Sequence, residues 1–282
     1  MSMGFKKIFS KLYNILFTSL KGSGLSKYSI FVKLHVFLTR QLKSEFVEIY
    51  DLKLFLGKND EGGYSSGNFY QNYYFDFLEK QISKGDVVID IGAKIGVYSI
   101  ALSKFVGSSG NVFSFEPTPE SFEILRKNKE ENSLNQLIIE QKAVTDKTST
   151  ELLELCEFSG NNRINNDCEN GIPVECVSID NYFSNFTKKI SFIKIDVEGF
   201  EPKVFSGMIS TLEKNPQTKI LFEYNPKLMK FYGFKPIKFL ENLVLQGFKL
   251  YDLEYSFTKN MSLEYFQKYE NSQKLTNIFI AK

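Results

Sequence analysis

A chain of 282 residues, 43% of them hydrophobic, can bury a sizeable core, and we expect one large α/β domain with some additional elements. Its 35 basic and 33 acidic residues leave a net charge of only +2, which argues against nucleic acid as a partner. His35 is the only histidine, and Cys156, Cys168 and Cys176 lack C-x-x-C spacing. We therefore expect reduced thiols in a cytoplasmic protein, no histidine catalysis and no histidine-ligated metal centre.

Residues 1–22 have the spacing of an amphipathic helix, with apolar side chains at Phe5, Ile8, Phe9, Leu12, Leu16 and Leu20. The apolar runs are too short to span a bilayer, and they do not resemble a signal peptide. Two interpretations remain open for residues 1–21: a helix packed on the domain or on a second copy of the chain, or a peripheral helix on a membrane surface. Because residues 28–42 predict another helix, we expect an N-terminal helical extension over 1–56 and a domain over 57–282.

The organising stretch of the chain is residues 86–117. Residues 87–91 form an apolar, β-branched run typical of a buried strand, and Asp90 interrupts it. Gly92 and Gly96 bracket a tight turn that opens a helix, and a second strand over 111–115 ends in Glu116. A carboxylate in a buried strand is costly without a partner or a cleft, so Asp90 is a candidate site residue.

This order of strand, turn, helix, strand and acid is typical of a nucleoside site, in which the second acid accepts the ribose hydroxyls. The turn reads D-x-G-x-x-x-G rather than the dinucleotide pattern G-x-G-x-x-G. A carboxylate before the glycines would repel phosphate and favour a cation, which favours S-adenosylmethionine with its ammonium and sulfonium groups. A structural turn without a ligand is the alternative.

Later segments complete an alternating α/β pattern. Thr118 is a good N-cap for a helix that runs to about residue 132, and Ser178 begins another. Strands are expected over 137–144, 149–156, 172–178, 191–195, 219–222, 248–253 and 277–281, with a helix over 237–245. The polar insert between the second and third of these segments has the composition of a loop, and it offers Asn161, Asn162 and Arg163 as substrate contacts or as a solvated hairpin tip.

Acidic residues follow two of the predicted core strands. The six residues after the predicted strand 191–195 include three acids, Asp196, Glu198 and Glu201. The predicted strand 219–222 is followed directly by Glu223. In an open α/β sheet the ligand crevice lies at the carboxyl ends of the strands, so we expect Asp196, Glu198 or Glu223 to supply the catalytic base. Helix capping is the structural alternative for at least one of these acids.

Four motifs in this order resemble the FkbM family of S-adenosylmethionine-dependent methyltransferases, over about residues 57–225. They read GDVVIDIGAKIGVYSIALS, FSFEPTPESFEILRKN, PVECVSIDNYF and FIKIDVEGFEPKVFSG. The chain departs from the family at Lys94, where the family usually has Asn. The resemblance implies a Rossmann-like, seven-stranded class I methyltransferase fold and places Tyr64 or Tyr70 near the cofactor or acceptor. Matching positions implied to contact the cofactor are Asp90, Gly92, Ala93, Gly96, Tyr98, Ser99, Glu116, Pro117 and Asp196.

The resemblance also implies transfer of a methyl group from S-adenosylmethionine to a hydroxyl of a sugar, glycan or other small metabolite. Two alternatives remain at this point. One is an NAD-dependent or nucleotide-sugar oxidoreductase on a Rossmann-like sheet, which the turn pattern does not favour. The other is a non-catalytic binding partner that kept the fold, for which Lys94 is the main argument.

Overall fold

The computed structural model describes residues 45–57, 72–156, 162–270 and 274–282. The chain divides into two compact units, Met1–Tyr70 and Gln71–Lys282. The helices expected within residues 1–42, together with His35, Tyr64, Tyr70 and Asn161, lie outside the described residues. The predicted domain boundary after residue 56 and the role of residues 1–21 remain predictions.

The described part of the first unit is a β-hairpin. Strands β1 (Phe46–Ile49) and β2 (Leu52–Phe55) pair antiparallel, and the rings of Phe46 and Phe55 lie 5.4 Å apart. Tyr50 and Asp51 both have positive φ, as a two-residue hairpin turn of the favoured twist requires. The expectation of a helical extension is therefore wrong for residues 46–55, where β-branched, leucine and phenylalanine residues on both sides of a tight turn favour strands.

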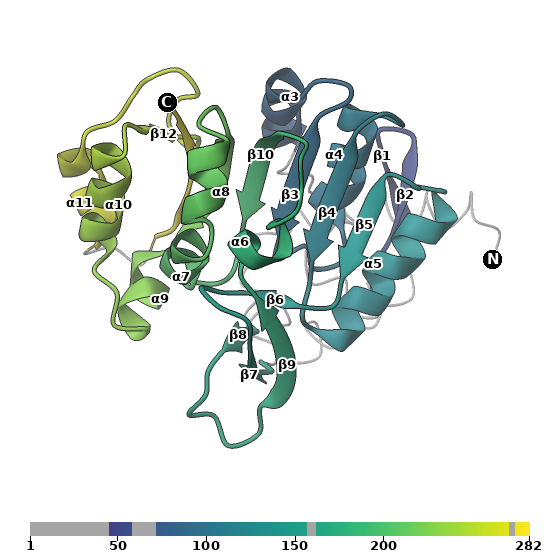
Figure 1. Cartoon of the computed structure of the whole chain (residues 1–282), viewed down its shortest axis with the longest axis horizontal. Helices are drawn as coiled ribbons and strands as arrows, with labels where there is room; N and C mark the ends of the chain where they lie inside the picture. The colour runs from purple at the N-terminus through teal and green to yellow at the C-terminus, as the bar shows by residue number, and fades with distance from the viewer. Residues whose placement is uncertain (1–44, 58–71, 157–161, 271–273) are drawn as a thin grey trace, which may run out of the picture. The chain divides into compact units, whose positions relative to one another are not determined.

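The second unit contains a seven-stranded sheet in the order β12-β13-β11-β10-β3-β4-β5 (Figure 1). Its strands are β3 (Val87–Ile91), β4 (Asn111–Phe115), β5 (Leu137–Glu140), β10 (Ile190–Ile195), β11 (Lys219–Tyr224), β12 (Lys249–Asp252) and β13 (Thr276–Ala281). Strands β5, β4, β3, β10 and β11 are parallel neighbours, whereas β13 lies antiparallel between β11 and β12. This is the doubly wound architecture that the sequence predicts.

Helices cover both faces of this sheet. They are α3 (Asn72–Gln81), α4 (Val97–Val106), α5 (Pro119–Glu131), α6 (Ile179–Tyr182), α7 (Glu201–Ser206), α8 (Ile209–Lys214), α9 (Pro226–Phe231), α10 (Pro236–Leu245) and α11 (Leu263–Glu270). In the described ranges, none of them combines the length and the apolar character that a bilayer-spanning helix needs.

The central strands present two chemically different faces. Ile89, Ile193 and Phe222 belong to the large apolar core that also contains side chains of α7, α8 and α10. On the opposite face, strand register places the buried side chains of Asp90, Ser114 and Lys194 in one row across β3, β4 and β10. Side chains alternate along a strand, so the polar residues that interrupt these apolar runs all fall on the same face.

A second sheet follows the carboxyl ends of the central strands. The predicted strand over 137–144 is wrong as a single element, because β5 ends at Glu140 and β6 (Ala143–Val144) joins a different sheet. This small sheet has the order β6-β9-β7-β8 and includes β7 (Ser149–Glu154), β8 (Arg163–Ile164) and β9 (Ile172–Val177). Figure 1 shows it beyond the arrow ends of β3, β4 and β10.

Candidate active site

The turn after β3 is tied to the neighbouring strand ends. The backbone N–H groups of Gly92 and Ala93 both donate to the carbonyl of Phe115 at 3.0 Å, and that of Asp196 donates to the carbonyl of Ile91. Gly92 has φ +76°, and a Cβ atom there would lie 1.8 Å from the carbonyl oxygen of Asp196. Gly92 therefore allows the end of β10 to approach the turn, while its predicted cofactor contact remains a prediction.

Gly96 serves packing as well as the turn. It has φ +91° and precedes α4, and an added Cβ would lie 2.5 Å from the side chain of Leu125 on α5. Ala93 is buried, whereas Tyr98 and Pro117 are half-buried. The Tyr98 ring lies 5.3 Å from that of Phe75. Direct cofactor contacts of these residues remain predictions.

Glu116 lies at the end of β4, where its carboxylate closes the turn. Oε2 accepts the N–H of Lys94 and Oε1 accepts the N–H of Thr118, both at 2.8 Å. Burial raises the pKa of Glu116, and these hydrogen bonds oppose the rise. Lys94, at φ +51°, thus contributes its backbone to the turn. Each carboxylate oxygen has a second lone pair, so Glu116 can still accept the two hydroxyls of a ribose.

Asp90 meets partners beneath the turn rather than opening onto a cleft. Its Oδ2 accepts the hydroxyl of Ser99 at 2.6 Å, and the hydroxyl of Ser114 donates to that of Ser99. The ammonium of Lys194 lies 3.6 Å from Oδ1 of Asp90 and 3.3 Å from Oδ2 of Asp196. Asp90 and Ser99 are fully buried, so both support the turn from below.

Sequence reasoning missed Lys194. Its ammonium also donates to the carbonyl of Gly92 and lies 4.8 Å from the centre of the Tyr98 ring. Burial alone would lower the pKa of Lys194, but the carboxylates of Asp196 and Asp90 outweigh burial and raise it, so the side chain is cationic. The sequence does contain a signal for Lys194, because this residue interrupts an apolar strand in the same way as Asp90 does.

Three of the predicted acids do meet at the carboxyl ends of β10 and β11. One carboxylate oxygen each from Asp196, Glu198 and Glu223 lies within 4.8 Å of the others. Residues 196–198 are not an extended segment, because β10 ends at Ile195 and Glu198 has φ +55°. A left-handed turn, rather than strand alternation, brings Glu198 to Asp196.

The three carboxylates are electrostatically coupled. Burial first, and the negative charge of Asp196 second, raise the pKa of Glu198 to about 7. Burial, followed by the charges of Asp196 and Glu198, raises the pKa of Glu223 to about 10. Glu198 can therefore exchange a proton near neutral pH, whereas Glu223 holds its proton.

Glu201 stabilises the loop that leads into α7, and its carboxylate lies in the first turn of that helix. It is the first residue of α7, and its Oε1 accepts the N–H groups of Val197 and Gly199. The insert residues also have local partners: Asn162 accepts the N–H of Cys156, and Arg163 forms an ion pair with Glu154 at 2.8 Å.

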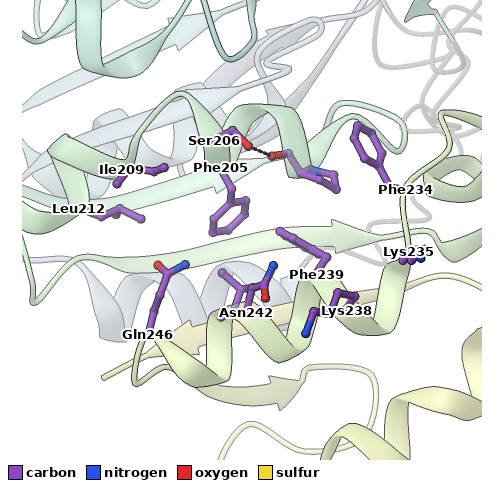
Figure 2. Close-up of a pocket in the computed structure, with 12 residues that line it drawn as sticks. Phe205, Ser206, Ile209, Leu212, Phe234, Lys235, Lys238, Phe239, Asn242 and Gln246 are labelled. Atoms are coloured by element: carbon purple, nitrogen blue, oxygen red, sulfur yellow. Dashed lines mark hydrogen bonds between the residues drawn. The ribbon is translucent and has the colours of Figure 1, made fainter.

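A separate groove lies between helices α7 and α8 on one side and helix α10 on the other. Figure 2 shows that Phe205 and Phe239 line opposite sides of this groove. Its volume is about 330 Å³, and its lining includes Leu212, Lys235 and Lys238 but none of the predicted site residues. The groove therefore plays no part in the site described above.

The donor and acceptor groups at the strand ends fit S-adenosylmethionine. Glu116 offers an acceptor for a ribose diol, and Asp196 offers a carboxylate for an ammonium group. The methyltransferase FkbM domain model matches residues 90–250, which is more than half of the chain. This chain belongs to the FkbM methyltransferase domain family. The family resemblance is thereby confirmed, together with its class I fold, and S-adenosylmethionine is the methyl donor of this family.

A curated relative is the hexuronic acid methyltransferase AglP of Haloferax volcanii, 26% identical over 137 residues. The match covers 48% of this chain, which spans about half (55%) of the relative's length. Similar solved structures include a putative rRNA methylase from Clostridium thermocellum, with TM-score 0.46, 11% identity and coverage of 74% and 93% of the two chains. Another is an O-methyltransferase from Bacillus cereus in complex with SAH, with TM-score 0.45, 15% identity and coverage of 76% and 82%.

Proposed function

We propose that this FkbM-family chain transfers a methyl group from S-adenosylmethionine to a hydroxyl oxygen of a sugar or glycan. The observation that carries the proposal is the meeting of Asp196, Glu198 and Glu223 next to the turn closed by Glu116. The hexuronic acid named for the relative is a sugar, which supports a sugar acceptor here.

S-adenosylmethionine, when bound, supplies a methyl group on a sulfonium sulfur that is already a good leaving group. The protein must then align the acceptor, exclude water and take up the hydroxyl proton. Glu198 suits this last role, because its pKa of about 7, raised mainly by burial, allows it to be ionised before the reaction and protonated after it. The carboxylate of Asp196 lies 3.3 Å from the ammonium of Lys194 and is 38% exposed, so it can also contact the ammonium group of the cofactor.

Titration calorimetry with S-adenosylmethionine tests the cofactor site. The Glu116→Ala variant loses two charge-assisted hydrogen bonds to the ribose. We therefore expect its binding free energy for S-adenosylmethionine to weaken by about 2 to 4 kcal/mol. Glu123→Ala, on the exposed face of α5, is the matched control and should bind as the wild type does.

Equal affinity of folded Glu116→Ala and wild-type protein would contradict this assignment. Incubation with labelled S-adenosylmethionine and fractionated cell extract then identifies the acceptor. Cofactor binding without any labelled product would favour the alternative of a non-catalytic binding partner.

A further inference from the structure

Arg163 on β8 makes two contacts that fix its guanidinium, but one nitrogen of that group has no hydrogen-bond partner among the described residues. Its Nη2 pairs with Oε2 of Glu154 at 2.8 Å, and the guanidinium carbon lies 4.8 Å from the centre of the Phe231 ring. The Nε atom is buried, and the described part of the chain offers it no hydrogen-bond partner. A buried, unsatisfied donor on a charged group is costly, and a bound acceptor would satisfy it.

The Phe231 ring that contacts this arginine belongs to a cluster of aromatic side chains. The rings of Phe231 and Tyr232 lie 5.2 Å apart, and Tyr232 lies 5.0 Å from Phe200. The hydroxyl of Tyr232 is also buried, and no partner for it occurs within the described ranges. Phe231 is 57% exposed, which leaves an aromatic surface open beside two unsatisfied donors.

This cluster is electrostatically linked to the proposed base. The positive charge of Arg163 acts on Glu198, where it opposes the rise of the pKa that burial causes. The charges of Arg163 and Glu198 likewise act on Tyr232, whose pKa is raised chiefly by burial. The geometry agrees, because the Phe200 ring that lies 5.0 Å from the Tyr232 ring belongs to a residue only two positions after Glu198.

We propose that Arg163 and Tyr232 form a subsite that binds the carboxylate of an acidic sugar and so directs one of its hydroxyls toward Glu198. A guanidinium nitrogen and a phenol hydroxyl are both donors, and a carboxylate accepts from both. A neutral hexose would leave the charged Nε without an anionic partner, so the subsite selects the acid over the neutral parent sugar. This inference rests on the proposed function.

Binding of paired probes to the full chain in the presence of SAH tests the subsite by calorimetry. The pairs are 4-nitrophenyl β-D-glucuronide with the glucoside, and the galacturonide with the galactoside. We expect at least one acid to bind about tenfold or more tightly than its neutral parent, as loss of a charge-assisted hydrogen bond predicts. Arg163→Gln should abolish this preference, and Tyr232→Phe should reduce it.

The matched control is Lys142→Gln, which removes the exposed ion pair with Glu175 on the same small sheet and should keep the preference. The subsite is refuted if neither acid binds better than its parent sugar, or if the preference survives in folded Arg163→Gln. Methyl transfer measured on the same probes separates the two proposals: an Arg163-dependent preference without transfer would support the subsite and contradict the proposed reaction.

Discussion

Lys194 is 5% exposed on the middle strand of the large sheet, with carboxylates of Asp90 and Asp196 on either side of its ammonium group. Moving an ion pair out of water is expensive, so such a pair adds little net stability, but removing one partner leaves an uncompensated buried charge. Lys194 therefore acts through Asp90 and Asp196, and it positions both of them.

We expect Lys194→Met to lower the free energy of unfolding by about 3 to 5 kcal/mol, because Asp90 would remain fully buried without its cation. Urea denaturation measures the change. Lys238→Met removes an ion pair whose side chains are 59% and 43% exposed, and it should cost less than about 1 kcal/mol. The double variant Lys194→Met with Asp90→Asn should be more stable than Lys194→Met; an equal loss would show that the buried charge is not the cause.

Glu198 is the residue on which the proton transfer is expected to depend. Burial and Asp196 raise its pKa to about 7, so wild-type kcat should rise with pH through about 7 and then level off as the base becomes ionised. Glu198→Gln and Asp196→Asn should fold, and at least one should lower kcat by about 100-fold or more. Cofactor affinity should stay within a few-fold in Glu198→Gln, because Glu198 has no assigned contact with the cofactor. Single-turnover rates with the identified acceptor measure this. Wild-type rates in both variants would place the base elsewhere.

At the scale of elements, the turn after β3 and the end of β10 are in backbone contact through Gly92. Gly92→Ala would place a Cβ atom 1.8 Å from a main-chain oxygen, and a backbone cannot move aside as a flexible side chain can. We expect a loss of about 3 kcal/mol or more in the free energy of unfolding, from the clash added to the positive φ.

Gly233→Ala separates the two causes. Gly233 has φ +78°, close to the +76° of Gly92, but a Cβ atom added there would meet no other atom within 4 Å. Gly233→Ala should therefore lower the free energy of unfolding by only about 1 kcal/mol, which is the strain of a residue in the left-handed conformation. Similar losses for the two variants in thermal or urea unfolding would mean that the contact between the turn and β10 is not important.

At the scale of the whole molecule, the buried acids predict how stability depends on pH. Burial raises the pKa of Glu201 to about 8, and the pKa values of Glu198 and Glu223 are raised in the same direction. The folded protein thus keeps protons that the unfolded chain releases above about pH 4.5. Stability from these groups is fully present below that pH and is lost as the pH rises through the folded-state pKa values.

We expect the free energy of unfolding to fall by about 1 kcal/mol or more between pH 5.5 and 8, as measured by urea denaturation. Glu201→Gln should reduce this dependence, because its amide oxygen can still accept the N–H groups of Val197 and Gly199 but cannot ionise. Glu151→Gln is the exposed control and should leave the slope unchanged. An identical slope for Glu201→Gln and the wild type would contradict the prediction.

The sequence by itself determined the elements that local chemistry specifies. The apolar runs of β3, β4 and β10 have the composition of buried strands, and the two glycines mark the turn because side chains disfavour positive φ. Glu116 was placed correctly at a strand end because an acid after a buried strand is a local pattern. The ordered motifs then indicated the family that the domain match confirms.

Only the tertiary structure decided which distant residues share a site. Glu223 meets Asp196 because β11 pairs with β10 in a particular register, and Lys194 meets Asp90 through the pairing of β10 with β3. Ala143 and Val144 belong to the small sheet rather than to β5, because their backbone pairs with β9. Local sequence patterns specify the alternation of side chains along one strand, but strand order and register depend on contacts between segments far apart in the chain, and these form only when the whole sheet packs.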